Sequence, residues 1–276
     1  MAFKVPVIPR LVQPLKQPSK LQSECLGLPS INIDALKLTK TIGSGNFGKV
    51  SLYHHGESYV IMKEMLGDSE DHERLFVKEA KLLNTIKHPN IVQFKGIVKS
   101  DEKTAFLMEY IHFDLTPFGN PKNISNLNQL KTNLDASDYA GFEHFQIIIA
   151  EDICKGLSFL HKNNIVHRDL KPDNVLVSNQ HCLGKQDIDK FWMEKPVIAK
   201  LSDFGESRSL LVQTNSLIHT RTDNVNRGTP VYIAPEIHLD STKANTLDEL
   251  KSMDIWSMAM IFYSLLNPNT RYVKSL

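Results

Sequence analysis

A dense group of polar side chains lies between two apolar, β-prone runs, Ile165–Val166 and Val175–Val177. Its members are His167, Arg168, Asp169, Lys171, Asp173 and Asn174. Such a group is costly in a core but typical of a loop that positions an active site. Further along, Asp203 ends another apolar run, and with Asn174 it offers the oxygen ligands that magnesium takes alongside phosphates. Each segment alone would also fit a solvated turn, but together they indicate chemistry on a phosphate-bearing ligand.

A lysine and a glutamate occupy positions that the apolar pattern predicts to be buried. Lys63 ends the apolar run 60–62, where an ammonium is costly unless it meets an anion. Glu79 falls on the apolar stripe of the next predicted helix, near Phe76 and Leu83. Either residue alone fits an exposed charge. As a pair they predict a buried ion pair that leaves the lysine poised toward a phosphate.

Three glycines, Gly43, Gly45 and Gly48, form a G-x-G-x-x-G pattern. The pattern alone is a weak signal, because a plain hairpin turn has the same composition. In a dinucleotide-binding fold it leads into a helix, whereas residues 49–53 continue as a strand, which excludes a nicotinamide oxidoreductase. A strand-turn-strand flap fits better, since glycines let main-chain N–H groups approach phosphate oxygens.

The elements that must position these residues form two unlike halves. β-prone runs are expected over 36–42, 50–53, 58–65, 91–98 and 104–111. Helical spacing of apolar residues predicts a helix over 74–86 and a buried one over 145–160. Between them, the Asn-rich, polar stretch 117–138 predicts a loop or insertion of low order. The sequence therefore predicts an α+β chain with a β-rich lobe, a helix-led lobe and a junction near residues 109–116.

Composition excludes several classes of protein. The 276 residues are 41 % hydrophobic and 23 % charged, as in globular domains, and the net charge of +1 gives no basic field for nucleic acid. The three cysteines are spaced too widely for a disulfide framework or a zinc site. The apolar run Ile255–Leu266 is too short for a membrane span, and prolines interrupt the amino terminus, so no secretory signal is expected. We expect a cytoplasmic protein.

The ordered motifs resemble the eukaryotic-type protein kinase family, from about residue 36 to about residue 266. The family template has a Gly-rich loop and a valine, a strand lysine, a helix glutamate, H-R-D-L-x-x-x-N, D-F-G and A-P-E. This chain has, in that order, Gly43 to Val50, Lys63, Glu79, His167 to Asn174, Asp203 to Gly205 and Ala234 to Glu236. The resemblance implies a bilobal kinase-like fold, with a small antiparallel β lobe carrying one helix and a larger, mainly helical lobe.

The resemblance also implies ATP and Mg²⁺ as cofactors and a role for each matched residue. Lys63, braced by Glu79, would hold the α- and β-phosphates. Asp169 would accept the proton of the attacking hydroxyl, and Lys171 would steady the γ-phosphate. The magnesium ligands would be Asn174 and Asp203. The nucleotide site would comprise Ile42, Gly43, Gly45, Gly48, Val50, Ile61, Lys63, Met108, Glu109, Ile111 and Leu176.

Local features of the resemblance indicate the substrate class. Lys171 and the run Gly228-Thr229-Pro230 resemble the serine/threonine form, which implies protein substrates with such acceptors. Arg168 precedes Asp169, an arrangement that in the family couples to a phosphorylated activation segment. An upstream kinase acting on residues 203–236 is therefore expected, with constitutive order of that segment as the alternative.

The chain also departs from the family pattern. Residues 1–34 are expected to form a flexible leader and 35–276 the kinase domain, with an N-lobe over 35–111 and a partial C-lobe over 112–276. Insertions are expected near 116–141 and 178–195, and Ile61 stands where alanine is usual. The last helices of the C-lobe have no counterpart, which predicts an exposed apolar patch formed by Ile255, Met258, Ile261, Phe262 and Leu265. The alternative to an active kinase is thus a catalytically silent nucleotide-binding scaffold.

Overall fold

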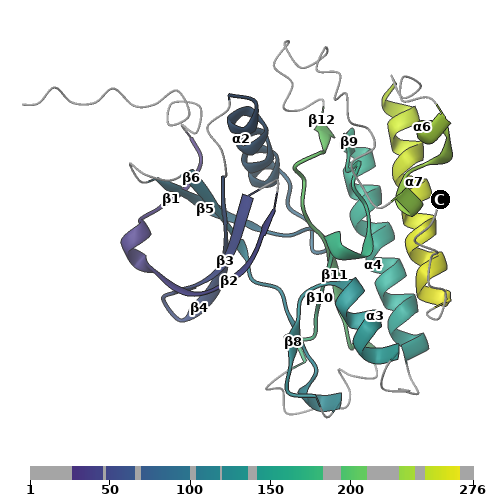
Figure 1. Ribbon diagram of the computed structural model, residues 1–276, viewed down its shortest axis with the longest axis horizontal. Coiled ribbons are helices and arrows are strands. Elements are labelled where there is room, and N and C mark those ends of the chain that lie inside the picture. The colour runs from purple at the N-terminus through teal and green to yellow at the C-terminus, as the bar shows by residue number, and fades with distance from the viewer. Residues whose placement is uncertain are drawn as a thin grey trace, which may run out of the picture.

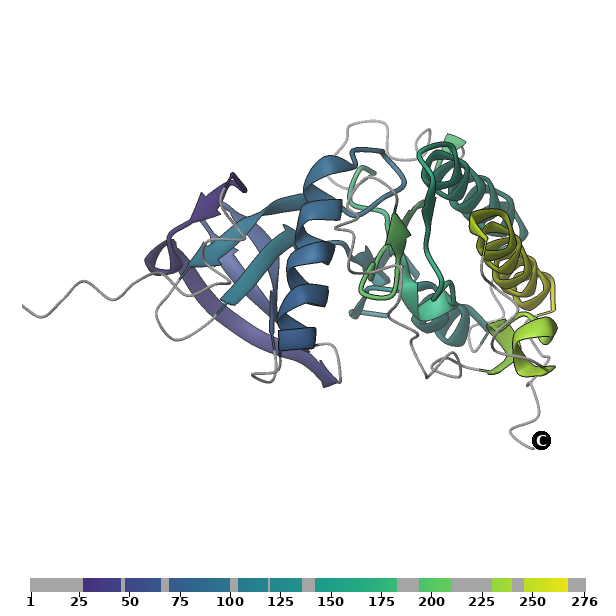
Figure 2. The same ribbon diagram turned by 90° about the horizontal axis from the view of Figure 1, so that it is seen from above.

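The chain folds into two lobes, a β-sheet with one helix and a mainly helical lobe (Figure 1). The computed structural model describes residues 27–45, 48–65, 70–99, 104–118, 120–135, 142–182, 194–209, 230–239 and 246–267. Seen from above, the helix α2 (Glu70–Thr85) lies against the sheet on the side of the second lobe (Figure 2). The α+β, bilobal prediction is confirmed.

The first lobe is built on a six-stranded sheet with the order β1-β5-β6-β4-β3-β2. Its strands are β1 (Ser30–Ile31), β2 (Leu36–Gly45), β3 (Gly48–His55), β4 (Ser58–Glu64), β5 (Phe94–Lys99) and β6 (Thr104–Glu109). Neighbouring strands are antiparallel except β1 and β5, which are parallel. The register pairs Val50 with Lys63 and Ile61 with Met108, so predicted site residues lie side by side across three strands.

Helix α2 buries one face of this sheet. The rings of Phe76 on α2 and Phe106 on β6 are 4.9 Å apart, and both side chains are buried with Leu82 and Leu83. Leu75, the neighbour of Phe76 in the sequence, is exposed, because it lies one position away from the contact face.

The opposite face of the sheet is covered by the segment that precedes β2. Ile31, Ile33 in the short helix η1 (Ile33–Ala35) and Leu36 pack on a cluster formed by Val60, Met62, Val98, Ala105 and Leu107. The prediction of a flexible leader is therefore wrong for residues 27–34, because their apolar side chains cover this face. Residues 1–26 of the predicted leader lie outside the described residues.

Two long helices, α4 (Phe142–Lys162) and α7 (Leu247–Leu266), lie side by side in the second lobe (Figures 1 and 2). Thr246 and Glu249 form a capping box at the start of α7. Short strands lie between these helices in the sequence, β9 (Ile165–Val166), β10 (Val175–Ser178), β11 (Ile198–Leu201) and β12 (Arg208–Ser209). Pairing of β10 with β11 and of β9 with β12 brings the two polar motif segments together. Short helices in the described part of this lobe include η3 (Pro172–Asn174), η6 (Pro230–Tyr232) and α6 (Pro235–Leu239).

The stretch predicted as an insertion of low order, 116–141, is largely ordered. It contains η2 (Thr116–Phe118), β8 (Asn123–Ile124) paired with β7 (Phe113–Asp114), and α3 (Leu127–Asp135). The expectation of low order is wrong where this stretch is described, because Ile124, Leu127 and Leu130 are buried in the main core, whereas the insertion itself stays a prediction. Of the other predicted insertion, Asn179 and Cys182 are buried, while residues 183–193 lie outside the described part.

The apolar face expected to be exposed on α7 is only partly so. Ile261 and Leu265 are buried and Met258 and Phe262 partly buried, because this face packs on the core. Ile255 is exposed as expected, and so are Trp256, Tyr263 and Leu266. Within the described ranges, no helix is both long enough and apolar enough to cross a bilayer.

Candidate active site

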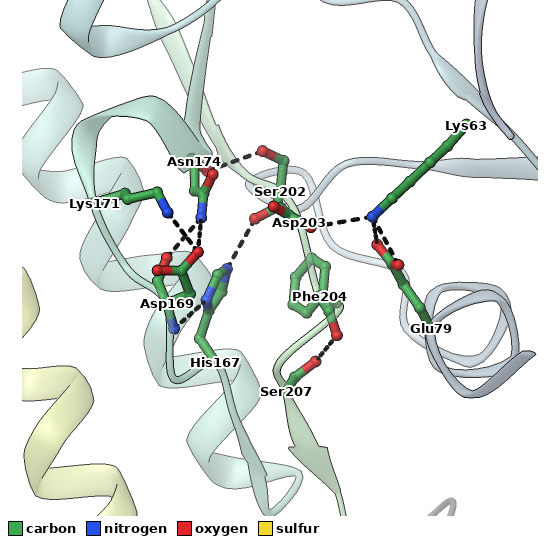
Figure 3. Close-up of polar contacts among 10 residues, drawn as sticks. All are labelled: Lys63, Glu79, His167, Asp169, Lys171, Asn174, Ser202, Asp203, Phe204 and Ser207. Carbon is green, nitrogen blue, oxygen red and sulfur yellow. Dashed lines mark hydrogen bonds and ion pairs between the residues drawn. The ribbon is translucent and has the colours of Figure 1, made fainter. Parts of the chain in front are cut away.

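Two carboxylates, one from each lobe, hold the ammonium of Lys63. It donates to both oxygens of Glu79, each at 2.8 Å, and to Oδ1 of Asp203 at 3.1 Å (Figure 3). Lys63 and Glu79 are 5 % and 4 % exposed, so the predicted buried ion pair is present. Because Asp203 comes from the segment after β11, this contact joins the two lobes.

Burial and charge act in opposite directions on these groups. Burial alone would lower the pKa of Lys63, but the charges of Glu79 and Asp203 outweigh it and raise that pKa above its ordinary value. Burial likewise opposes ionisation of Asp203, yet Lys63 lowers the pKa of that carboxyl below its usual range. The complete burial of Glu79 raises the pKa of its carboxyl, and Lys63 opposes this effect. Lys63 is therefore a fixed positive charge.

Asp169 lies on the other side of Asp203 in a compact hydrogen-bond group (Figure 3). Its Oδ2 accepts Lys171 Nζ at 2.7 Å and Asn174 Nδ2 at 2.9 Å, and Asn174 also donates to the main-chain oxygen of Asp169 at 2.7 Å. The main-chain oxygen of Asn174 accepts the N–H of Ser202 at 2.9 Å. These bonds hold the two motif segments in register, with Asp203 next to Asn174.

Helix α7 anchors the loop that carries Asp169 through the side chain of Asp254. Asp254, 1 % exposed, accepts the main-chain N–H of His167 and of Arg168, each at 2.8 Å, and contacts His161 Nε2 at 2.9 Å. Arg168 has a φ of 71°, a left-handed conformation that is unfavourable for a residue with a side chain. The two bonds from Asp254 offset that cost.

The Gly-rich turn needs glycine at one described position in particular. Gly48 has a φ of 134°, and a Cβ there would overlap the main-chain oxygen of Glu64 on β4. At Gly43 a Cβ would meet nothing within 4 Å. Gly48 therefore lets β3 and β4 approach closely beside Lys63.

Comparison with known protein families agrees with this geometry. The family model described as the protein kinase domain matches residues 36–275. The chain belongs to the protein kinase family. All the motif residues named above lie inside the matched range.

Curated relatives of this kinase chain are serine/threonine kinases. Probable serine/threonine-protein kinase gdt4 of Dictyostelium discoideum is 32% identical over 238 residues, 86% of this chain and 12% of that protein. Receptor-interacting serine/threonine-protein kinase 1 of Homo sapiens is 26% identical over 262 residues, 90% of this chain and 34% of that protein. Ovarian-specific serine/threonine-protein kinase Lok of Drosophila melanogaster is 26% identical over 258 residues, which are 89% of this chain and 46% of that protein. The chain thus spans less than half the length of these relatives.

In the run 106–111, which resembles the hinge strand of the kinase family, Glu109 connects the lobes through its side chain. Its Oε1 accepts Lys200 Nζ of β11 and the N–H of Gln93, both at 2.7 Å. The main-chain N–H of Glu109 is engaged as well, since it donates to the main-chain oxygen of Gln93 at 2.9 Å.

Most of the other residues expected around the nucleotide lie on strands β2, β3, β4 and β6 of the first lobe, whereas Ile111 follows β6 and Leu176 lies on β10. Gly43 pairs with Val50 across β2 and β3, and Ile61 pairs with Met108 across β4 and β6. Ile111 is buried, Leu176 on β10 is partly buried, and Ile42 is 46 % exposed. Gly45 ends β2, next to residues 46–47, which are outside the described part.

The donor set at Asn174 and Asp203 fits magnesium. Both bonds from the Asn174 side chain use its nitrogen, so its carbonyl oxygen is not used by them and is a hard donor, to which Asp203 adds a carboxylate. The described ranges contain no cluster of three or more His, Cys, Asp or Glu side chains that could hold a metal. Magnesium needs no such cage, because it binds through one or two protein ligands together with phosphates.

The segment after Asp203 is described only to Ser209. Ser207 Oγ donates to the main-chain oxygen of Phe204, and the main-chain oxygen of Ser207 accepts Lys78 Nζ at 2.5 Å. Ser207 and Ser209 are both buried, which disfavours them as phosphorylation sites in this conformation. The remaining candidates, Thr214, Ser216, Thr220 and Thr222, lie outside the described residues.

Asn90, which the sequence did not indicate as a functional residue, joins the two lobes through its bonds to β11. Its Nδ2 donates to the main-chain oxygen of Ala199 at 3.0 Å, and its own main-chain oxygen accepts the N–H of Leu201 at 2.9 Å. Asn90 is 3 % exposed, and its N–H donates to His88 Nδ1 at 3.1 Å. The available signal was the turn His88-Pro89-Asn90 at the end of a predicted helix.

Proposed function

We propose that this chain is a protein kinase that transfers the γ-phosphoryl group of MgATP to serine or threonine hydroxyls of protein substrates. The observation that carries the proposal is the convergence of two groups on Asp203. Lys63 and Glu79 lie on one side of it, and Asp169, Lys171 and Asn174 lie on the other (Figure 3).

Positioning and charge neutralisation are what phosphoryl transfer asks of a protein. Lys63, fixed by Glu79, presents a positive charge where the phosphates of the nucleotide would lie. Bound MgATP would supply the phosphoryl group and the cation that neutralises the charge developing on it. The bonds from Lys171 and Asn174 both end on Oδ2 of Asp169. We therefore assign Oδ1 of Asp169 to orient the acceptor hydroxyl and take its proton.

The proposed acceptor class rests on Lys171 and on the relatives. The ammonium of Lys171 lies 2.7 Å from Asp169, beside the place where an acceptor hydroxyl would meet the γ-phosphate. Three relatives from different organisms carry serine/threonine kinase in their names. We propose further that an upstream kinase phosphorylates the segment 203–236.

A cytoplasmic location is part of the proposal. ATP-dependent signalling takes place there, and both cysteines in the described part of the chain, Cys154 and Cys182, are free thiols.

The experiment that tests this function is phosphoamino-acid analysis after incubation with γ-labelled ATP, magnesium and a generic basic protein. Label on serine or threonine supports the proposal, and label on tyrosine alone contradicts the acceptor class. ATP binding without any transfer would instead favour the silent scaffold.

A further inference from the structure

The side chain of Asn179 holds the main chain of Asp114 at two points. Its Oδ1 accepts the N–H of Asp114 at 2.8 Å, and its Nδ2 donates to the main-chain oxygen of Asp114, also at 2.8 Å. Asn179 is completely buried. A buried amide satisfied on both sides by one residue is strongly specified, because loss of either partner leaves a polar group unpaired.

These two bonds take the place of a strand partner at one edge of β7. On one edge, Asp114 in β7 pairs with Asn123 in β8. On the other edge, the amide of Asn179 offers the same donor and acceptor that a neighbouring strand would offer. The hairpin of β7 and β8 is thereby joined to the end of β10.

Asp114 and Asn179 each follow a residue assigned to the nucleotide site by the same number of positions. Asp114 follows Ile111 of the hinge by three residues, and Asn179 follows Leu176 by three residues. The other main-chain contacts between these segments, Val177 N–H to Ser125 at 3.0 Å and the bridge of Leu176 with Asn126, begin beyond β8. The two bonds between Asn179 and Asp114 are nearer in sequence to the hinge than these contacts.

We propose that Asn179 is a positioning residue that sets the spacing between the hinge at Ile111 and the floor of the nucleotide site at Leu176. The inference rests on the proposed function, because those two residues are assigned to the adenine site. Asn179 then governs the affinity for ATP while leaving the transfer step to Asp169 and Lys63. A merely structural residue would change stability and leave nucleotide affinity alone.

The test compares Asn179→Asp and Asn179→Ala with the control Asn163→Asp. Asn163 lies near the end of α4, and its Nδ2 donates to the main-chain oxygen of Phe159 at 2.8 Å, far in sequence from the hinge. Asn179→Asp keeps the size of the side chain but sets a carboxylate oxygen against the main-chain oxygen of Asp114. Asn179→Ala removes both bonds without that repulsion and serves if the first variant does not fold.

The readouts are the Kd of MgATP by calorimetry, the KM for ATP and kcat, and hydrogen exchange at the Asp114 amide. For Asn179→Asp we expect Kd and KM to rise about tenfold, the effect of about 1.4 kcal/mol, with kcat within about twofold of the original chain. The Asp114 amide should exchange faster in Asn179→Ala, which removes the oxygen that accepts its N–H, and Asn163→Asp should match the original chain.

The outcomes separate this inference from the function it rests on. Unchanged Kd in both Asn179 variants, or a fall in kcat at constant KM, would overturn the inference alone. Failure of the unaltered chain to bind MgATP would overturn the proposed function and the inference together. Unchanged exchange at Asp114 in Asn179→Ala would show that the contact between Asn179 and Asp114 does not exist in solution.

Discussion

The carboxylate of Asp254 accepts the main-chain N–H of His167 at 2.8 Å, although the two residues are 87 positions apart in the chain. A second bond to the N–H of Arg168 fixes the next peptide, so the loop that bears Asp169 is attached to the middle of α7. The position of Asp169 is thus set by a helix far from it in sequence. This relationship makes α7 the support of the loop that bears Asp169.

Replacing Asp254 with asparagine should destabilise the protein and lower its activity. The amide retains one oxygen, and its nitrogen must face an N–H donor, so at least one buried bond to a charged group is lost. We expect a loss of roughly 3 kcal/mol in the free energy of unfolding, measured by urea denaturation. Asp248→Asn, at an exposed position of the same helix, should change it little. Equal stability of the two variants would contradict the anchoring role.

Glu79→Gln tests the support of Lys63. The amide cannot balance the ammonium charge, which then depends on Asp203 alone. We expect the rate of phosphotransfer to fall about 100-fold, a magnitude typical for loss of a preorganised electrostatic contact. The matched change Glu73→Gln on the same helix should leave the rate within about twofold. A rate measured at saturating ATP that is equal in both variants would show that the ion pair is dispensable.

Two glycines of the Gly-rich turn should respond differently to alanine. At Gly48 the new Cβ overlaps the main-chain oxygen of Glu64 and the φ is unfavourable, so the unfolding free energy should fall by roughly 2 kcal/mol. At Gly43 the added methyl meets open space, so Gly43→Ala should be nearly neutral for stability. Thermal denaturation of both variants measures the difference. Similar melting temperatures would refute the steric account.

Acid should weaken the contact in which His88 accepts the main-chain N–H of Asn90. Burial lowers the pKa of His88, and its Nδ1 accepts the N–H of Asn90, so the folded chain favours the neutral ring. The stability that His88 contributes is therefore present above its unfolded pKa of about 6.5 and is lost as pH falls through the lower folded pKa. Asparagine at this position keeps an acceptor but does not titrate. Urea denaturation from about pH 7.5 to about pH 5 should show a smaller decline for His88→Asn than for the original chain. Parallel declines in the two proteins would argue against this role.

Much of the site could be predicted from the sequence because its chemistry is local. The position of Lys63 in an apolar strand and of Glu79 on an apolar stripe predicted their ion pair, and the pair is present at 2.8 Å. The polar group around Asp169 predicted a loop between two short strands, which β9 and β10 provide. In these cases one element's periodicity was enough.

The misses depend on contacts between distant segments. The Asn-rich composition of 117–138 predicted low order, whereas the spacing of Ile124, Leu127 and Leu130 was the better guide, since all three are buried. The roles of Asn90 and Asn179 could not be predicted, because their partners lie 109 and 65 positions away. A polar residue that replaces a strand partner leaves no periodic signal.

The central claim is that Asp169 carries the transfer of phosphate, and the rate of γ-phosphoryl transfer in Asp169→Asn tests it most directly. The control is Asp173→Asn, at an exposed carboxylate of the same loop that accepts Asn128 Nδ2. We expect a loss of about 10³-fold for Asp169→Asn with unchanged ATP affinity, and a rate within about twofold for Asp173→Asn. Transfer by Asp169→Asn at the rate of the original chain would contradict it.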